Sequence, residues 1–145
     1  MSKVSELLAI KGPQVWTIPP RATVLDAALL MNEHKIGGLV VTDQDRVVGM
    51  FTERDVLRRI VAERRDPAAT AVADVMTAEV VCCQPDTSID EARSAMKNRR
   101  IRHLPVVDER GSLRGLISIG DLNAHQAMSQ EQTICLLNDY LYGRV

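Results

Sequence analysis

Residues 47–55 read VVGMFTERD, and residues 113–121 read LRGLISIGD. Each stretch begins with a short apolar strand, continues with Thr or Ser, and reaches Asp three residues later, where a helix is expected to begin. A repeated unit of this kind cannot bury its apolar face alone, so the two copies are expected to pack on each other. The sequence therefore predicts a pseudo-symmetric pair of units with two equivalent clefts.

The repeat extends well beyond these two stretches. Residues 20–43 match residues 85–108 at a constant offset of 65, and the offset becomes 66 after one extra residue in the turn near Gly111. The segments expected as strands are short and apolar, and apolar residues recur at helical spacing in those expected as helices. Each unit therefore reads as strand, helix, strand, strand and helix. We expect an α/β, α+β-like fold in which two such units pack sheet to sheet.

The boundaries of the elements follow from the repeat. The first unit with an N-terminal helix is expected at residues 1–66, the second unit at 67–128, and a C-terminal helix at 129–145. Strands are predicted at residues 15–18, 39–42, 47–52, 80–83, 103–107 and 113–118. Helices are predicted at residues 4–10, 23–36, 53–64, 88–100 and 119–128, and Gly37-Gly38 is expected to end the second of them.

Composition and charge exclude several classes of protein. Of the 145 residues, 46% are hydrophobic but only 3% are aromatic, which predicts an aliphatic core. The net charge of −1 gives no basis for binding nucleic acid or an anionic membrane. No apolar stretch approaches the roughly 18 residues that a membrane span needs, and the N-terminus lacks the pattern of a secretory signal. We therefore expect a cytoplasmic protein with neither nucleic-acid nor membrane partners.

Residues that carry catalytic or metal chemistry are sparse. Cys82, Cys83 and Cys135 form no C-x-x-C pair, and with three scattered histidines they give no metal-ligand spacing. The sequence also lacks a nucleophile with a paired base and a Walker-type phosphate loop. We therefore expect reduced thiols, no bound metal, no catalytic residues and no enzymatic activity.

The helix that begins after Thr52 offers chemistry suited to a nucleotide. The first N–H groups of a helix lack intrahelical partners and attract anions. The Thr52 hydroxyl can donate to a phosphate oxygen, the Asp55 carboxylate suits the two hydroxyls of a ribose, and Arg54 can grip phosphate bidentately. The same residues also fit a plain N-cap followed by an acid in the first turn, so this pattern alone leaves both interpretations open.

A family resemblance appears at this point. It depends on the Gly-x-x-Thr-x-x-Asp motif at residues 49–55, the Gly-x-x-Ser-x-x-Asp motif at 115–121, DVMT at 74–77 and HLPVV at 103–107. Residues 12–128 resemble a tandem pair of CBS (cystathionine-β-synthase) domains, the so-called Bateman module, and we expect a free-standing one. The resemblance implies a regulatory module that binds an adenosine compound (AMP, ADP, ATP, S-adenosylmethionine or NAD) between the repeats as a regulatory ligand, not as a catalytic cofactor. It also implies a homodimer that signals to a separate, unknown protein effector.

The same resemblance assigns further ligand-binding residues to each site. The strand before the first helix of each unit and the segment that enters the next strand are expected to read the adenine. At one site these residues are Thr17, Ile18, Ile36, Gly37 and Gly38, and at the other they are Val81, Cys82, Arg102, His103, Leu104 and Pro105. They join the motif residues Thr52, Arg54, Asp55, Ser118 and Asp121.

The two expected sites are not equivalent. Only the first motif has an arginine, Arg54, between its Thr and its Asp, whereas the second has Ile119 and Gly120 there. We therefore expect the first site to prefer ligands that bear phosphate. The second site is expected to borrow charge from Arg99, Arg100, Arg102 or His103. An alternative function is a protein-interaction scaffold whose ligand clefts are vestigial.

Overall fold

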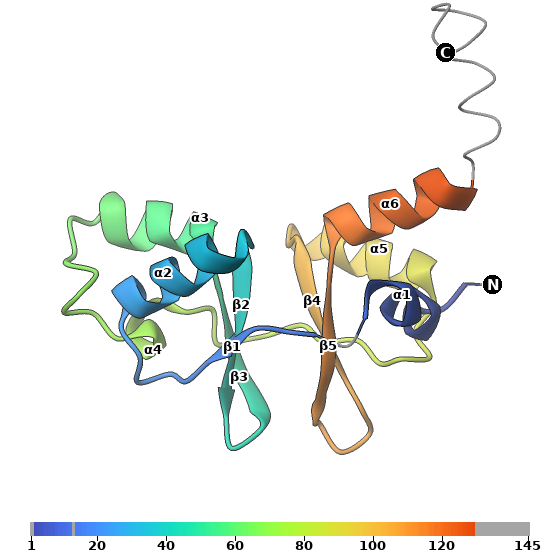
Figure 1. Ribbon diagram of the computed structural model, residues 1–145, viewed down its shortest axis with the longest axis horizontal. Coiled ribbons are helices and arrows are strands. Elements are labelled where there is room, and N and C mark those ends of the chain that lie inside the picture. Colours follow the sequence, from blue (N-terminus) through green and yellow to red (C-terminus); the bar gives the residue numbers. More distant parts are fainter. Residues whose placement is uncertain (1, 13, 130–145) are drawn as a thin grey trace, which may run out of the picture.

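The computed structural model describes residues 2–12 and 14–129, and it shows two units side by side with their strands at the centre and their helices outside (Figure 1). In the first unit, strand β1 runs parallel to β2, and β2 runs antiparallel to β3. Helix α3 continues directly into η1, a π-helix. The elements of this unit are β1 (Thr17–Ile18), α2 (Val24–His34), β2 (Gly38–Asp43), β3 (Arg46–Thr52), α3 (Glu53–Asp55), η1 (Val56–Val61) and α4 (Val72–Val75).

The second unit repeats this order with a smaller sheet, in which β4 and β5 pair antiparallel. Its elements are α1 (Val4–Lys11), α5 (Ile89–Arg99), β4 (His103–Val107), β5 (Leu113–Ser118) and α6 (Ile119–Ser129). The mixed helix-and-strand class and the paired units predicted from the repeat are confirmed. The C-terminal helix expected at residues 129–145 lies, from residue 130 onward, outside the described residues.

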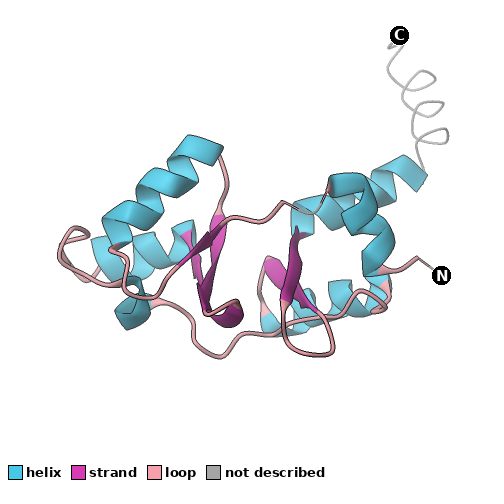
Figure 2. Cartoon of the chain, turned by 60° about the horizontal axis from the view of Figure 1, so that its bottom comes forward, coloured by secondary structure: helices cyan, strands magenta, loops and turns pink. Residues whose placement is uncertain are grey.

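Successive side chains of each strand point to opposite faces, and this lets the two sheets pack face to face. Leu39 and Val41 of β2 point into the core of the first unit, whereas Val40, between them, is fully buried and belongs to neither helical core. In the second unit, Leu104 and Val106 point into the core, and Pro105 lies on the opposite, central side. Each sheet thus has one face toward its helices and one toward the other sheet, as Figures 1 and 2 show.

Each unit is completed by a helix that precedes the other unit in the sequence. Val4 and Leu7 of α1 are buried in the core of the second unit, and the corresponding Val72 and Val75 of α4 are buried in the core of the first. The backbone contacts match as well: the Val4 N–H donates to a carbonyl of the second unit and the Val72 N–H to a carbonyl of the first. The segments that follow α1 and α4 therefore cross between the units (Figure 1).

The strand predicted at residues 80–83 is reduced to a single parallel bridge between Cys83 and Val106. In the first unit the equivalent strand is longer, because the Val40 N–H donates to the Trp16 carbonyl at 3.3 Å. The residue that matches Val40 in the second unit is Pro105, which has no N–H to donate. The expectation of a full first strand in the second unit was therefore wrong, and the proline explains it.

Two expected helix ends also differ. Helix α2 ends at His34, and its C-cap is Lys35, whose φ of 54° lies in the left-handed region; Gly37-Gly38 does not cap it. The helix expected to reach about Arg64 is regular only over Glu53–Asp55 and then widens into η1, which ends at Val61. The wider π-helical turn is uncommon and occurs frequently at functional sites.

Candidate ligand-binding clefts

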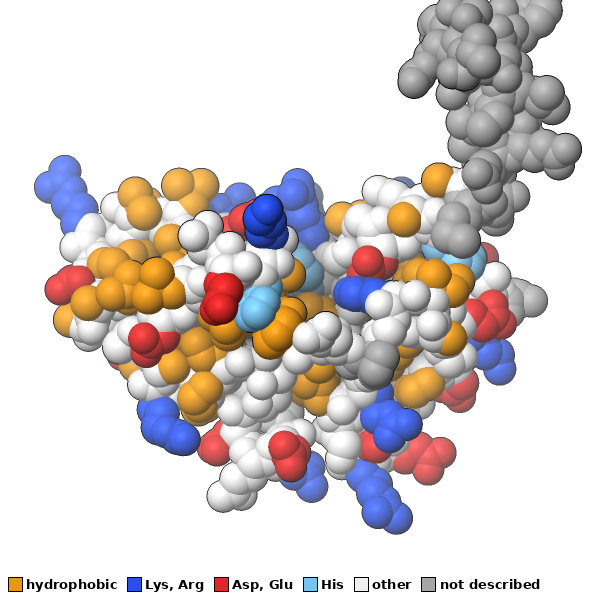
Figure 3. Space-filling view, in the orientation of Figure 1, with side chains coloured by type: hydrophobic (Ala, Val, Ile, Leu, Met, Phe, Trp, Pro, Cys, Tyr) orange, Lys and Arg blue, Asp and Glu red, His pale blue; other side chains and the backbone are white. Residues whose placement is uncertain are grey.

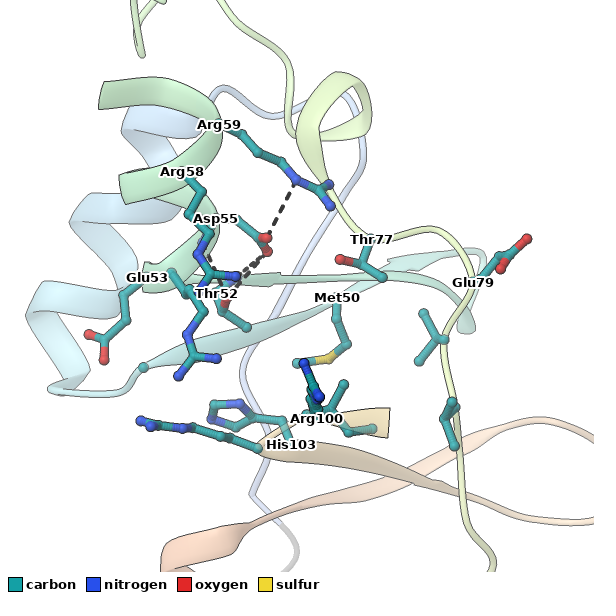
Figure 4. A pocket seen from close by; sticks show the side chains of 16 residues that line it. Met50, Thr52, Glu53, Asp55, Arg58, Arg59, Thr77, Glu79, Arg100 and His103 are labelled. Atoms are coloured by element: carbon teal, nitrogen blue, oxygen red, sulfur yellow. Dashed lines mark hydrogen bonds and ion pairs between the residues drawn. The ribbon is translucent and has the colours of Figure 1, made fainter. Parts of the chain in front are cut away.

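A cavity of about 270 Å³ lies between the two units, beside α3 and η1. We call it the first cleft. Its walls come from the helix start of the first unit, from the segment that follows α4, and from the turn between α5 and β4, as Figure 4 shows in close-up. The lining residues are Gly37, Met50, Thr52, Glu53, Arg54, Asp55, Arg58, Arg59, Thr77, Glu79, Val80, Val81, Arg100, Ile101, Arg102 and His103.

Thr52 and Asp55 form a closed pair at one wall of the first cleft. The Asp55 Oδ2 atom accepts from the Thr52 N–H at 2.9 Å and from the Thr52 hydroxyl at 3.2 Å. The Thr52 Oγ1 atom in turn accepts from the Asp55 N–H at 3.3 Å. The hydroxyl proton of Thr52 thus points to Asp55 and not to an anion in the cleft. The Oδ1 atom of Asp55 takes no part in this pair.

The helix start itself is a weaker anion site than the sequence suggested. The N–H groups of Thr52 and Asp55 are used in the pair just described, and the Glu53 N–H donates to the Gly37 carbonyl at 3.0 Å. Helix α3 also has only three residues before the π-helical turn. Positive charge in this cleft therefore comes from side chains and not from backbone N–H groups.

Arg59, which the sequence interpretation missed, fixes the wall that holds Asp55. Its guanidinium donates to the Val75 carbonyl at 2.7 Å and to the Met76 carbonyl at 3.0 Å. Its Nε atom lies 3.8 Å from the Asp55 Oδ1 atom. The sequence spacing could have revealed this contact, because Arg58 and Arg59 follow Asp55 by three and four residues and share its helix face.

The arginines that precede β4 lie in the first cleft and not in the second. Arg100 and Arg102 line the first cleft together with Arg54 and Arg58 of the first unit. The expectation that Arg100 and Arg102 lend charge to the second motif was therefore wrong. Because the units pack across a pseudo-twofold axis, the segment that enters β4 faces the helix start of the other unit.

A second hollow of about 440 Å³ lies beside β5 and α6, and we call it the second cleft. Its motif residues, Ser118 and Asp121, repeat the geometry of the first motif, because the Ser118 N–H donates to the Asp121 Oδ2 atom at 2.8 Å and the Asp121 N–H to the Ser118 Oγ atom at 3.1 Å. The lining residues are Lys11, Gln14, Val15, Trp16, Lys35, Ile36, Gly37, Gly38, His103, Leu116, Ser118 and Asp121.

A lysine of α1 already forms an ion pair with the motif carboxylate of the second cleft. The Lys11 Nζ atom lies 2.8 Å from the Asp121 Oδ2 atom and donates to the Leu116 carbonyl at 2.6 Å. The corresponding residue in the segment after α4 is Glu79, which lines the first cleft and has the opposite charge. The second motif is thus neutralised by a close ion pair at 2.8 Å, whereas the cation nearest to the carboxylate of the first motif, among the ion pairs of the described residues, is Arg59 at 3.8 Å.

His103 lies between the two clefts and lines both of them. A methyl group placed on Gly38, its match in the first unit, would lie 3.3 Å from the His103 ring. Burial lowers the pKa of His103, and Lys11 lowers it further, against the opposing influence of Asp121 and Glu53. The imidazole is therefore neutral near pH 7, because its pKa lies below its ordinary value of about 6.5.

The residues predicted to bind the ligand divide into four groups. Thr52, Arg54, Asp55, Val81 and Arg102 line the first cleft, Ile36, Gly38, Ser118 and Asp121 line the second, and Gly37 and His103 line both. Thr17, Ile18, Cys82, Leu104 and Pro105 line neither.

The five outlying residues have other positions in the fold. Ile18 and Leu104 are core residues of the two units, and Pro105 is buried between the sheets. Thr17 and Cys82 are exposed. Partial burial of the thiol raises the pKa of Cys82, and burial together with the neighbouring Cys82 raises the pKa of Cys83 to about 12, so both thiols stay protonated at neutral pH.

Neither a metal-ligand cluster nor a membrane-spanning helix occurs in the described part of the chain. Between residues 2 and 129, leaving out Pro13, no cluster of three or more His, Cys, Asp or Glu side chains is arranged to hold a metal ion. Within the same residues, no helix has the length and apolar character needed to cross a membrane.

Comparison with known proteins agrees with the paired clefts. The family model of the CBS domain matches twice, at residues 4–62 and 72–127. A CBS domain-containing protein of Bacillus subtilis, YhcV, is 36% identical over 138 residues, which cover 95% of each chain. The structure of a putative signal-transduction protein with CBS domains from Burkholderia ambifaria superposes with a TM-score of 0.84 at 41% identity, covering 89% of this chain and 96% of that one.

A third protein was solved with a ligand. It is a CBS domain protein from Pyrobaculum aerophilum in complex with AMP, with a TM-score of 0.74 and 31% identity, and the match covers 82% of this chain and 88% of that one. The two family matches together span most of the sequence, one on each repeat. The chain therefore belongs to the CBS domain family and contains two copies of the domain in tandem.

Proposed function

We propose that this protein is a regulatory module that binds an adenosine-containing nucleotide in its first cleft and passes the bound state on to a separate protein. The observation that supports it best is the combination of Asp55 with a nearby apolar slot and free arginines in one cavity. The AMP complex of the Pyrobaculum aerophilum relative supports the class of ligand. The proposal assigns no catalytic role to the protein.

Each part of a nucleotide has a matching wall in the first cleft. Met50, Val80, Val81 and Ile101 offer apolar surface for the base. The Oδ1 atom of Asp55 is oriented by the Thr52 pair and suits the ribose hydroxyls, because an ionised carboxylate only accepts hydrogen bonds. The arginines from both units suit the phosphate. Because these walls belong to different units, a ligand here would touch both and could shift their relative position.

Titration calorimetry tests the function directly. We expect AMP, ADP and ATP to release or absorb heat with one site per chain, and guanosine monophosphate, which has the same phosphate but a different base edge, to bind at least about tenfold more weakly. Adenosine without phosphate is the second control. If adenosine and all the adenine nucleotides, NAD and S-adenosylmethionine included, give no heat, the scaffold alternative is favoured.

We also propose that the protein forms a homodimer through the outer helices of the first unit. Leu29 of α2 and Leu57 of η1 are 59% and 61% exposed, and Leu25 and Val61 extend the same apolar patch. Figure 3 shows hydrophobic side chains gathered over this end of the molecule. The matching positions of the second unit are small or polar: Asp90, Ser94, Asn123 and Ala127. An apolar patch limited to one unit favours a partner, and a second copy offers a complementary patch.

The dimer is tested by sedimentation velocity of charge-substituted variants. We expect the wild-type protein to sediment as a dimer and the Leu29→Glu/Leu57→Glu variant to sediment as a monomer, because two buried carboxylates would face each other. The matched control is Ser94→Glu/Asn123→Glu, which places the same charges on the equivalent helices and is expected to remain dimeric. A wild-type monomer, or a control that dissociates equally, would contradict this proposal.

An effector protein and a cellular location complete the proposed function. The effector that reads the ligand-bound state is a separate protein. A cytoplasmic location is consistent with Cys82 and Cys83, which are both free thiols, because disulfides are rare in that compartment.

A further inference from the structure

The arginines of the first cleft exceed what one phosphate group needs. Five line the cavity, three from α3 and η1 and two from the turn before β4. Arg59 is held by two backbone carbonyls and lies near Asp55. The remaining four, among the residues that the structure describes, form no hydrogen bond or ion pair through their guanidinium groups. They are Arg54, Arg58, Arg100 and Arg102.

The carboxylates of the cleft do not neutralise these four arginines. Asp55 is engaged by Thr52 and lies beside Arg59, and the Glu53 carboxylate is turned toward Gly37, since a methyl group placed there would lie 3.3 Å from its Oε1 atom. Glu79 lies at the far rim, away from the guanidinium groups (Figure 4). Four like charges around one cavity repel each other, although solvent screens this repulsion where the side chains are exposed, and a bound anion relieves it.

Geometry also separates these arginines into two pairs. Arg54 and Arg58 come from the helix of the first unit, and Arg100 and Arg102 come from the second unit across the cavity. A guanidinium binds a phosphate bidentately with two parallel hydrogen bonds, so the three oxygens of one terminal phosphate satisfy only about two arginines. A chain of two or three phosphates offers enough oxygen atoms to bind both pairs.

We infer that the first cleft is selective for adenosine nucleotides that carry two or more phosphates, and that the phosphate chain bridges the two units. This inference rests on the proposed function, because it concerns the same cleft. It narrows the ligand from any adenosine compound to the di- and triphosphates. It also gives the arginines before β4 a defined role, which is to contact the terminal phosphates from the second unit.

Calorimetry with adenosine, AMP, ADP, ATP and inorganic tripolyphosphate tests the inference on the full chain. We expect ADP and ATP to bind at least about tenfold more tightly than AMP, because each added charge-assisted contact is worth about that factor. The affinity for ATP should also fall more steeply with added salt than the affinity for AMP, because exposed charges are screened.

Single substitutions locate the phosphate chain. Arg58→Gln and Arg102→Gln are each expected to weaken ATP binding about tenfold and AMP binding less than about threefold. Arg21→Gln removes the same charge from an exposed position that lines neither cleft, and it should leave both affinities unchanged. Thermal melting of each variant checks that it is folded.

The outcomes separate this inference from the proposed function. Equal affinity for AMP and ATP, or equal losses for both ligands in the arginine variants, would overturn the selectivity and leave nucleotide binding intact. Tripolyphosphate that binds as tightly as ATP, or the absence of binding by every adenosine compound, would instead overturn the proposed function.

Discussion

Replacing Gly49 with valine is expected to lower the free energy of unfolding by about 2–3 kcal/mol. Gly49 lies on β3 where the segment after α4 crosses it, and a Cβ atom there would contact the Met76 side chain and lie 3.0 Å from the Thr77 carbonyl oxygen. That carbonyl is fixed, because it accepts from the Met50 N–H at 2.9 Å while the Thr77 N–H donates to the Met50 carbonyl at 2.9 Å. A backbone held by two hydrogen bonds cannot move aside as a flexible side chain can.

Thermal and urea unfolding measure the effect, and we expect the melting temperature to fall by roughly 10 °C. Gly115→Val is the matched comparison on β5, where the Cβ atom would lie 2.8 Å from a methyl group of Leu8. Because a leucine side chain can rotate away, this variant should lose about half as much stability. If Gly49→Val unfolds like the wild type, the segment at Met76 and Thr77 does not cross β3 as described.

This crossing shows what the sequence could and could not predict about the fold. The repeat located the strands and helices because apolar periodicity is a local property that each segment carries by itself. It did not show that α1 packs on the second unit and α4 on the first, because sequence order says nothing about which of two similar cores a helix joins. A signal was present, since Val4, Leu7 and Leu8 match Val72, Val75 and Met76, but it identifies equivalent helices and not their partners.

The motif glycines illustrate the same limit. These glycines belong to the family motif. Glycine is needed at both positions because a segment from outside the motif approaches the backbone too closely to leave room for a side chain. Pro105 shows the opposite situation. The sequence itself reveals that this residue has no backbone N–H, and the missing N–H shortens the strand at Cys83. That effect becomes visible only when the parallel pairing of Cys83 with Val106 is known.

The sequence predicted the motif of the candidate site, but it did not predict how the two units combine to form each cleft. Thr52 and Asp55 were found because their spacing is a local signature, and they do lie together on one wall. Arg102 was assigned to the wrong cleft, because the resemblance groups residues by unit, whereas the packed units place each entry segment opposite the helix of the other. Lys11 was missed because its partner, Asp121, is distant in the sequence and is brought near only by the position of α1.

The contrast between the two clefts leads to a matched pair of substitutions. Asp55→Ala is expected to weaken the binding of adenine nucleotide about ten- to a hundredfold, which corresponds to the loss of a hydrogen-bond acceptor of full charge. Asp121→Ala is expected to change the affinity less than about threefold, because Lys11 already holds that carboxylate at 2.8 Å. Calorimetry at one ionic strength measures both variants.

The pair is matched in structure as well as in chemistry. Asp55 accepts from the Thr52 N–H at 2.9 Å and Asp121 from the Ser118 N–H at 2.8 Å, so each alanine variant loses the same helix-capping contact, worth about 1 kcal/mol of stability. A difference in affinity between them therefore reports on the ligand and not on the cap. Equal losses of affinity would show that the clefts are equivalent, and a larger loss for Asp121→Ala would place the ligand in the second cleft, with Lys11 displaced from its carboxylate.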